Sequence, residues 1–291
     1  MHNQNKKYWV WLSILTNVVE IKTIHKLLNK YKEPEYIWNL SKKELKRCKI
    51  QMKEINNILS IKYRQELENY MFYMKKVHII IISYNDNEYP ALLKNIVNPP
   101  VVLYARGNVD LLNKVSVGIV GCRRCSYYGK EIARKMAFEL SKKDITVVSG
   151  LARGIDTWSH IGALNGKGNT IAVLGSGLDN IYPPENKGVY QKIIETGGLV
   201  ISEYIVGIKP LAHHFPNRNR IISGLSKGVL LVEARKRSGS FITVDYALEQ
   251  GRDVYAIPSD ITRTEYVGAN ELIKQGAKLV TNVSDIIEDL N

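Results

Sequence analysis

Residues 115–150 decide the fold class and read VSVGIVGCRRCSYYGKEIARKMAFELSKKDITVVSG. Two apolar runs in this stretch, Val115–Val120 and Ile145–Ser149, are rich in valine and isoleucine and lack polar alternation. Such runs are typical of strands that are buried on both faces of a parallel sheet. Between them, Tyr128–Leu140 places its apolar side chains at helical spacing. The stretch therefore predicts a strand, a loop, a helix and a second strand parallel to the first.

The same alternation continues to the end of the chain. Further runs, separated by glycine-bearing turns and helix-length segments, lie at Thr170–Gly175, Gly198–Ser202, Gly228–Glu233, Asp253–Pro258 and Lys278–Val280. A connector at residues 84–114 contains turn signals and one expected strand, Val101–Tyr104. Repeated strand–helix units with right-handed crossovers predict a doubly wound α/β fold with a mostly parallel sheet.

Residues 1–76 follow a different, helical pattern. They contain no glycine and one proline, Pro34, and their apolar residues recur at helical spacing. Ser41 followed by Glu44 is a capping-box pattern that predicts the start of a helix. A long helix is expected from about Met52 to Met74. We therefore expect two domains, a small helical module at residues 1–76 and an α/β domain at residues 77–291.

The charge of the chain is strongly basic. The sequence has 41 Lys and Arg against 28 Asp and Glu, a net charge of +13, of which residues 1–76 carry +9 (16 basic minus 7 acidic residues). A basic balance favours polyanions such as nucleic acid, although lysine-rich helical faces are often only solvated surface. No apolar run is long enough to span a membrane, the start lacks a secretion signal, and three cysteines form no disulfide framework. These features favour a cytoplasmic protein.

Small and basic residues follow four of the expected strands. They are Gly121, Arg123 and Ser126 after the first, Ser149, Gly150 and Arg153 after the second, Gly175 and Gly177 after the third, and Ser238 and Gly239 after a later one. Glycine lets a backbone approach a ligand closely, serine donates a hydroxyl, and arginine forks onto phosphate. Because ligands of open parallel sheets bind outside the carboxyl ends of the strands, these loops predict an anion-binding face.

The segment Phe215–Ser226 adds a further basic cluster. Pro216 fits the first turn of a helix, and Arg218 and Arg220 follow directly. Arginine near a helix N-terminus opposes the helix dipole, and an anionic ligand would offset that cost. The alternative is an ion pair of these arginines with Glu203 or Glu233.

Several other kinds of site are disfavoured by their spacing. The run that begins at Gly175 lacks the third glycine of a dinucleotide-binding fingerprint, and no P-loop motif occurs. Cys122 and Cys125 have no further ligands at zinc-binding spacing and are read as small residues of a tight turn. Ser149, Asp156 and His160 lack the surroundings of a hydrolytic nucleophile, so His160 is expected to pack or to hydrogen-bond locally.

Taken together, these residues resemble the DprA (Smf) family of DNA-processing proteins. The matching segments are Gly121-x-Arg123-x-x-Ser126-x-x-Gly129, Ser149–Asp156, Tyr182-Pro183, Phe215–Ser226 and Ser238-Gly239-Ser240, within a match from about Val77 to Val280. The resemblance implies an extended Rossmann-like domain after a SAM-like or helix-hairpin-helix-like module. It also implies a protein that binds and protects single-stranded DNA, helps to load RecA in natural transformation, and dimerises through this domain.

The resemblance also implies roles for individual residues. Arg123 would be a principal phosphate ligand. Phe215, with Arg218, Asn219 and Arg220, would line the groove that holds the strand and a base. Gly121, Ser149 and Gly150 would shape the anion pocket. Relatives often carry a lysine at the position of Ala212, so Lys209, His213 or His214 would take over its contact.

This interpretation makes the protein a binder, with no catalytic residue and no cofactor. One alternative is a nucleotide-processing enzyme similar to the LOG phosphoribohydrolases. Their signature contains a catalytic glutamate after a glycine-rich run, whereas Glu233–Thr243 has one glycine and no glutamate at that spacing. A second alternative is a scaffold that recruits RecA and binds no DNA itself.

Overall fold

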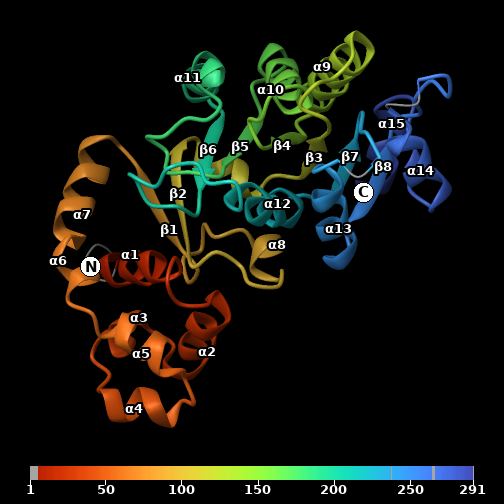
Figure 1. Cartoon of the computed structure of the whole chain (residues 1–291). Helices are drawn as coiled ribbons and strands as arrows, with labels where there is room; N and C mark the ends of the chain where they lie inside the picture. Colours follow the sequence, from red (N-terminus) through yellow and green to blue (C-terminus); the bar gives the residue numbers. More distant parts are fainter. Residues whose placement is uncertain (1–5, 237, 264–265, 291) are drawn as a thin grey trace.

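The computed structural model of the chain describes residues 6–236, 238–263 and 266–290 (Figure 1). One nine-stranded sheet forms its centre, with the strand order β1-β2-β6-β5-β4-β3-β7-β8-β9. The strands are β1 (Ile80–Ser83), β2 (Val102–Gly107), β3 (Ser116–Val120), β4 (Thr146–Ser149), β5 (Thr170–Leu174), β6 (Leu199–Ser202), β7 (Gly228–Leu231), β8 (Asp253–Ala256) and β9 (Lys278–Leu279).

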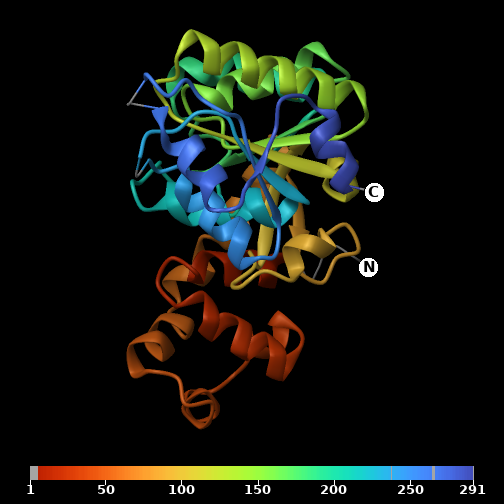
Figure 2. The same cartoon turned by 90° about the vertical axis from the view of Figure 1, so that its right-hand side faces the viewer.

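Strands β3 to β9 pair in parallel, while β2 is antiparallel to both of its neighbours, β1 and β6. Helices α9 (Tyr127–Lys142), α10 (Ile155–Asn165) and α11 (Lys187–Glu195) cover one face of the sheet, and α12 (His214–Leu225) and α13 (Phe241–Glu249) cover the other (Figures 1 and 2). The remaining helices of this part are α8 (Ala91–Lys94), α14 (Gly268–Lys274) and α15 (Ser284–Leu290). The expected doubly wound, mostly parallel sheet is confirmed.

The direction of winding reverses next to β3. From β3 the chain builds β4, β5 and β6 outward on one side, and then returns through α12 to place β7 against the other side of β3. Residues of β3 and β5 are all buried, as expected from their mostly apolar sequence. In open α/β sheets, the crevice at the carboxyl ends of the strands beside such a reversal is where ligands bind.

The helical module comprises α1 (Lys6–Leu15), α2 (Ile21–Tyr31), α3 (Pro34–Trp38), α4 (Lys42–Arg47), α5 (Met52–Ile58), α6 (Lys62–Gln65) and α7 (Leu67–Lys76). Its core is continuous with that of the sheet, because Trp11 of α1 and Tyr104 of β2 belong to one buried apolar cluster. The hydroxyl groups of Ser13 and Tyr104 form a hydrogen bond of 2.5 Å within it. The domain boundary after residue 76 stays a prediction.

The expectation of one long helix from Met52 to Met74 is wrong. The structure has three short helices there, α5, α6 and α7. Arg64 of α6 supplies the physical reason, because its guanidinium lies 4.1 Å from the Trp38 ring and donates a 2.7 Å hydrogen bond to the Trp38 carbonyl. This tertiary contact outweighs the helical periodicity. The capping box of Ser41 and Glu44 at the start of α4 is confirmed.

Among the described residues, every helix is too short or too polar to cross a lipid bilayer.

Candidate functional site

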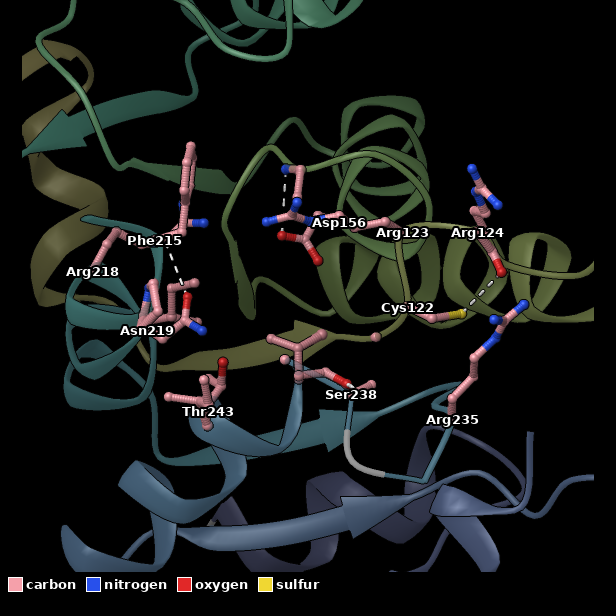
Figure 3. Close-up of a pocket in the computed structure, with 18 residues that line it drawn as sticks. Cys122, Arg123, Arg124, Asp156, Phe215, Arg218, Asn219, Arg235, Ser238 and Thr243 are labelled. Carbon is pink, nitrogen blue, oxygen red and sulfur yellow. Dashed lines mark hydrogen bonds between the residues drawn. The ribbon is translucent and has the colours of Figure 1, made fainter. Parts of the chain in front are cut away.

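A cavity of about 520 Å³ lies at the point where the sheet reverses its winding. It is lined by the loops that follow β3 and β7, by the start of α12, and by Ala152 and Asp156 after β4. Figure 3 shows Phe215, Arg218 and Asn219 of α12 on one side of this cavity and Arg124 and Arg235 on the opposite side. We call it the switch-point cavity.

The loop from Gly121 to Ser126 is held in place by the buried carboxylate of Glu233. Glu233 accepts hydrogen bonds from the Ser126 backbone N–H at 2.7 Å and from the Ser126 hydroxyl at 2.5 Å. Ser126 also caps α9 by accepting from the Gly129 N–H at 3.0 Å. A Cβ on Gly121 would lie 2.9 Å from the Glu233 carbonyl oxygen. Ser126 and Gly121 therefore shape the loop, and the Ser126 hydroxyl and backbone N–H are already hydrogen-bonded.

Exposed arginines line the rim of the switch-point cavity. Arg123, Arg124 and Arg235 are exposed. Within residues 6–236, 238–263 and 266–290, none of the three forms a salt bridge. Arg124 and Arg235 were not singled out from the sequence, although both lie in loops that directly follow strands. Their free guanidinium groups make this rim a cationic surface.

Arg218 lies beneath the same cavity and is buried. Its Nη1 donates to the carbonyl oxygens of Val173 and Gly150, the latter at 2.7 Å. Burial lowers the pKa of the Arg218 guanidinium to about 10. Burial also raises the pKa of Asp156, which accepts hydrogen bonds from the backbone N–H groups of Gly150 at 3.0 Å and Ala152 at 3.4 Å. Arg218 lines the switch-point cavity and is also a buried cation that fixes neighbouring loops, and its contact with a bound strand stays a prediction.

Gly150 and Ser149 belong to the buried layer of residues around Arg218. A Cβ on Gly150 would lie 2.5 Å from the Arg218 guanidinium, so the arginine requires a glycine there. The Ser149 hydroxyl is buried and donates to the Ile119 carbonyl at 2.7 Å. Neither residue presents a free polar side chain to the cavity. Both residues support the wall of the cavity from the protein interior.

Arg220 does not line the switch-point cavity. It is buried on the other side of α12, where its guanidinium donates to both carboxylate oxygens of Glu203 at 2.8 and 2.7 Å. Its Nε also donates to the Asn98 carbonyl at 3.1 Å. The expectation of a groove-lining Arg220 is therefore wrong, and the alternative of an ion pair with Glu203 is confirmed. Burial and the ion pair with this carboxylate disfavour a phosphate contact by this arginine.

Lys209 and His213 lie at a second cavity. This cavity, of about 700 Å³, is lined by the opposite face of the start of α12 and by residues 16, 17 and 19–21 of the helical module. The structure therefore separates Lys209 and His213 from Arg123 and Phe215, which the sequence had grouped together. The position of Lys209 in a loop before the helix gave no indication of which face it would reach.

Two adjacent aromatic rings lie between two guanidinium groups along one edge of the site. The Arg123 guanidinium lies 5.6 Å from the Phe215 ring centroid, and the Phe215 and Tyr182 rings lie 5.5 Å apart. The Arg153 guanidinium lies 5.9 Å from the Tyr182 ring and pairs with Glu185. We call Arg123, Phe215, Tyr182 and Arg153 the stacking row. Tyr182 appeared in the sequence only as part of a motif and was missed as a site residue.

The remaining candidate residues surround these groups. A Cβ on Gly175 would lie 3.1 Å from the Phe215 ring, so this glycine makes room for the ring. Gly177 lines neither the switch-point cavity nor the stacking row. Ser238 and Gly239 line the cavity, and the Ser238 hydroxyl is hydrogen-bonded to that of Ser240. Arg237, between the cavity residues of this loop, lies outside the described residues.

The residues weighed for hydrolysis or redox chemistry have structural partners. His160 is buried, accepts from the Leu151 N–H at 3.3 Å and contacts the Thr170 hydroxyl at 2.8 Å. Burial lowers its pKa to about 3, and the expectation of local hydrogen bonding is confirmed. Burial raises the pKa of the Cys122 thiol to about 12, which disfavours the thiolate that a nucleophile or a metal ligand needs. Among the described residues, no group of His, Cys, Asp and Glu side chains is arranged to hold a metal ion.

The arrangement can bind an anion beside a planar group. Free arginines at the rim attract phosphate, and Phe215 with Tyr182 offers aromatic faces. These are the two elements of a site for a nucleotide strand.

Comparison with known proteins agrees with this geometry. The family model of DNA recombination-mediator protein A matches residues 80–291. The DNA processing protein DprA of Streptococcus pneumoniae is 48% identical over 204 residues, which are 70% of this chain and 72% of that protein. Protein Smf of Escherichia coli is 41% identical over 227 residues, 78% of this chain and 61% of its own length.

Two solved structures have the same fold. That of DprA from Streptococcus pneumoniae has a TM-score of 0.83 at 36% identity and covers 97% of both chains. That of DprA from Helicobacter pylori, described as revealing a single-stranded DNA binding mode, has a TM-score of 0.66 at 32% identity and covers 73% of this chain and 96% of its own. On the match of residues 80–291 and the identity to these relatives, the chain belongs to the DNA recombination-mediator protein A family, whose members include proteins named DprA and Smf.

Proposed function

We propose that this protein binds single-stranded DNA in the switch-point cavity and along the stacking row, and thereby shields the strand. The main observation behind this proposal is that exposed Arg123 lies beside the Phe215 ring at the rim of the cavity, with a guanidinium-to-ring distance of 5.6 Å. Arginine neutralises the backbone phosphate, and an aromatic ring stacks on a base of any sequence. The Helicobacter pylori relative, described as binding single-stranded DNA, supports this choice of ligand.

Single strands fit this surface better than a duplex. A base can reach Phe215 only when its face is not covered by neighbours in a stacked duplex. The site also lies in a cavity of about 520 Å³ instead of on a protruding helix or strand that could enter a groove. We therefore expect preference for single strands with little dependence on sequence.

We further propose that the protein acts by binding without catalysis. Glu233, the acid that anchors the loop after β3, is buried and accepts two hydrogen bonds from Ser126. It is therefore a poor candidate for the catalytic acid of a nucleotide-processing enzyme. Incubation with nucleoside monophosphates should release no free base, and release of base would favour the enzyme alternative.

The wider role is proposed from the family. A recombination mediator hands single-stranded DNA to a recombinase, so we propose RecA as a protein partner, a homodimer formed through the Rossmann-like domain, and action in the cytoplasm during transformation or recombination. A gel shift with the purified protein alone separates direct DNA binding from a scaffold role, because a pure scaffold would leave the oligonucleotide unshifted.

A salt titration tests the DNA site. For about four neutralised phosphates on a single strand, log K should fall against log salt with a slope of roughly −3. Arg123→Ala removes one phosphate contact, so we expect weaker binding at low salt and a slope that is smaller in magnitude by about 0.7. Binding is measured by fluorescence anisotropy with single- and double-stranded oligonucleotides of the same sequence.

Arg47→Ala is the matched control for this titration. Arg47 is an exposed arginine of α4, at the end of the helical module far from the cavity (Figure 1). Its removal lowers the net charge by the same amount and should leave the slope unchanged. Equal effects of both substitutions would mean that only overall charge matters, and that the assigned site is wrong.

A further inference from the structure

The far end of the stacking row has a geometry of its own. Tyr182 lies beside Phe215 with a ring separation of 5.5 Å and an interplanar angle of 46°, and the Arg153 guanidinium lies 5.9 Å from the Tyr182 ring. With Arg123 they line one small depression of about 10 Å³. This volume is too small to enclose a base, so a base would lie on the accessible part of these half-buried rings.

The loop that carries Tyr182 is fixed to the loop that carries Arg153. The side-chain amide of Asn186 donates to the Leu151 carbonyl at 2.8 Å and to the Thr157 hydroxyl at 2.8 Å. The Ser176 hydroxyl donates to the Asn180 carbonyl at 2.6 Å and holds the start of the same loop. The ring and the guanidinium are thus pre-positioned, which reduces the entropy lost on binding.

An acidic side chain occupies the place of a phosphate in this arrangement. Glu185 accepts from Arg153, and side-chain exposures of 47% for Arg153 and 52% for Glu185 leave their ion pair open to water. Exposed pairs contribute little to stability and weaken in salt. A strand phosphate can therefore replace the carboxylate at little cost, and it brings a base to Tyr182 at the same time.

We propose that Tyr182 and Arg153 form a second nucleotide subsite next to Phe215, and that Glu185 occupies its phosphate position when no DNA is bound. The inference rests on the proposed function, because it extends the same strand by one nucleotide. Tyr182 stacks on the neighbouring base, Arg153 binds its phosphate, and Glu185 lowers the affinity by competing for Arg153.

Stacking at Tyr182 predicts different results for two substitutions. Tyr182→Ala removes the ring and should weaken binding of an oligodeoxythymidylate by at least about fivefold. Tyr182→Phe keeps the ring and loses only the hydroxyl, so its affinity should stay within about twofold of the wild type. A 2-aminopurine placed at successive positions of the strand should be quenched at neighbouring positions by Phe215 and Tyr182, and Tyr182→Ala should restore its fluorescence at one position only.

Competition by Glu185 predicts a gain of affinity. Glu185→Gln should tighten binding by about two- to fivefold at low salt, with a smaller gain at high salt. Glu139→Gln is the matched control. Like Glu185, Glu139 of α9 forms an ion pair with a basic side chain, Lys135, but it lines neither the cavity nor the stacking row. It should leave the affinity unchanged.

The full-length chain is used throughout, and thermal unfolding confirms that each variant folds. If Phe215→Ala weakens binding while Tyr182→Ala and Glu185→Gln bind like the wild type, the second subsite is refuted and the proposed DNA site survives. If the wild-type protein fails to bind the oligonucleotide, both the proposed function and the second subsite are refuted.

Discussion

Arg123 and Arg218 carry the same guanidinium group in different surroundings. Arg123 is exposed and lies over the Phe215 ring, whereas Arg218 is 3% exposed and donates to the carbonyls of Gly150 and Val173. An exposed cation is available to a phosphate, while a buried one stabilises the loops around it. The two arginines should therefore be separable by experiment.

Substitution of each arginine by alanine should affect stability unequally. Arg218→Ala leaves two buried carbonyls without this donor and Asp156 without its nearby positive charge, so we expect a loss of about 3–5 kcal/mol in the free energy of unfolding. Arg123→Ala should change it by less than about 0.5 kcal/mol. Urea unfolding followed by tryptophan fluorescence measures both, and similar losses for the two variants would contradict the assigned roles.

From the sequence, the position of a residue at the site could be predicted more often than its role there. Arg123 could be placed because it directly follows a strand whose carboxyl end must lie at the ligand edge. The role of Arg220 could not be predicted in this way. Whether its guanidinium binds a ligand or pairs with Glu203 depends on which side of α12 faces the sheet. Tyr182 was missed because its contact with Phe215 joins a loop to the start of α12, which are distant in sequence.

At the scale of elements, the strands were predictable and one helix was not. Apolar runs rich in valine, isoleucine and leucine mark β3 to β8, because a strand buried on both faces favours apolar side chains. The region from Met52 to Met74 has a helical stripe, yet Arg64 breaks it by packing on Trp38. Local periodicity carries no information about such a tertiary contact.

Glycines in α10 and α11 provide a test of the packing between elements. In α10, a Cβ on Gly162 would overlap the backbone carbonyl of Arg134 in α9, whereas one on Gly188 in α11 would meet nothing within 4 Å. We expect Gly162→Ala to lower the free energy of unfolding by about 1–3 kcal/mol, because the two helices must separate. Gly188→Ala should raise it by up to about 1 kcal/mol through helix propensity.

Thermal and urea unfolding of the two glycine variants measure this difference. The substitutions add the same methyl group to a helix, so they differ in surroundings alone. A stabilising effect of Gly162→Ala would show that α9 and α10 do not approach as closely as the structure has them.

At the scale of the whole molecule, the basic charge and the candidate site lie in different places. Residues 1–76 carry +9 of the net +13, yet the exposed arginines that meet an aromatic ring belong to the loops of the sheet. Composition indicates a polyanionic partner but cannot locate its site. The reversal of winding beside β3 locates it, because it opens the crevice in which the loops after β3 and β7 meet α12.

The helical module and the sheet form one body in this molecule. Trp11 and Tyr104 share a core, and the His25 ring lies 2.7 Å from the Pro99 carbonyl oxygen. Residues of the module also line the second cavity on the far face of α12. The second cavity is therefore the alternative to the switch-point cavity as a binding site for DNA.

Photocrosslinking compares the two cavities directly. The full-length chain is irradiated with a single-stranded oligonucleotide that carries 5-iododeoxyuridine, and the modified residues are identified by mass spectrometry. Because this base reacts with the aromatic rings on which it stacks, we predict adducts on Phe215 and Tyr182. Adducts confined to Tyr204 and Tyr246 of the second cavity, or to the helical module, would contradict the account.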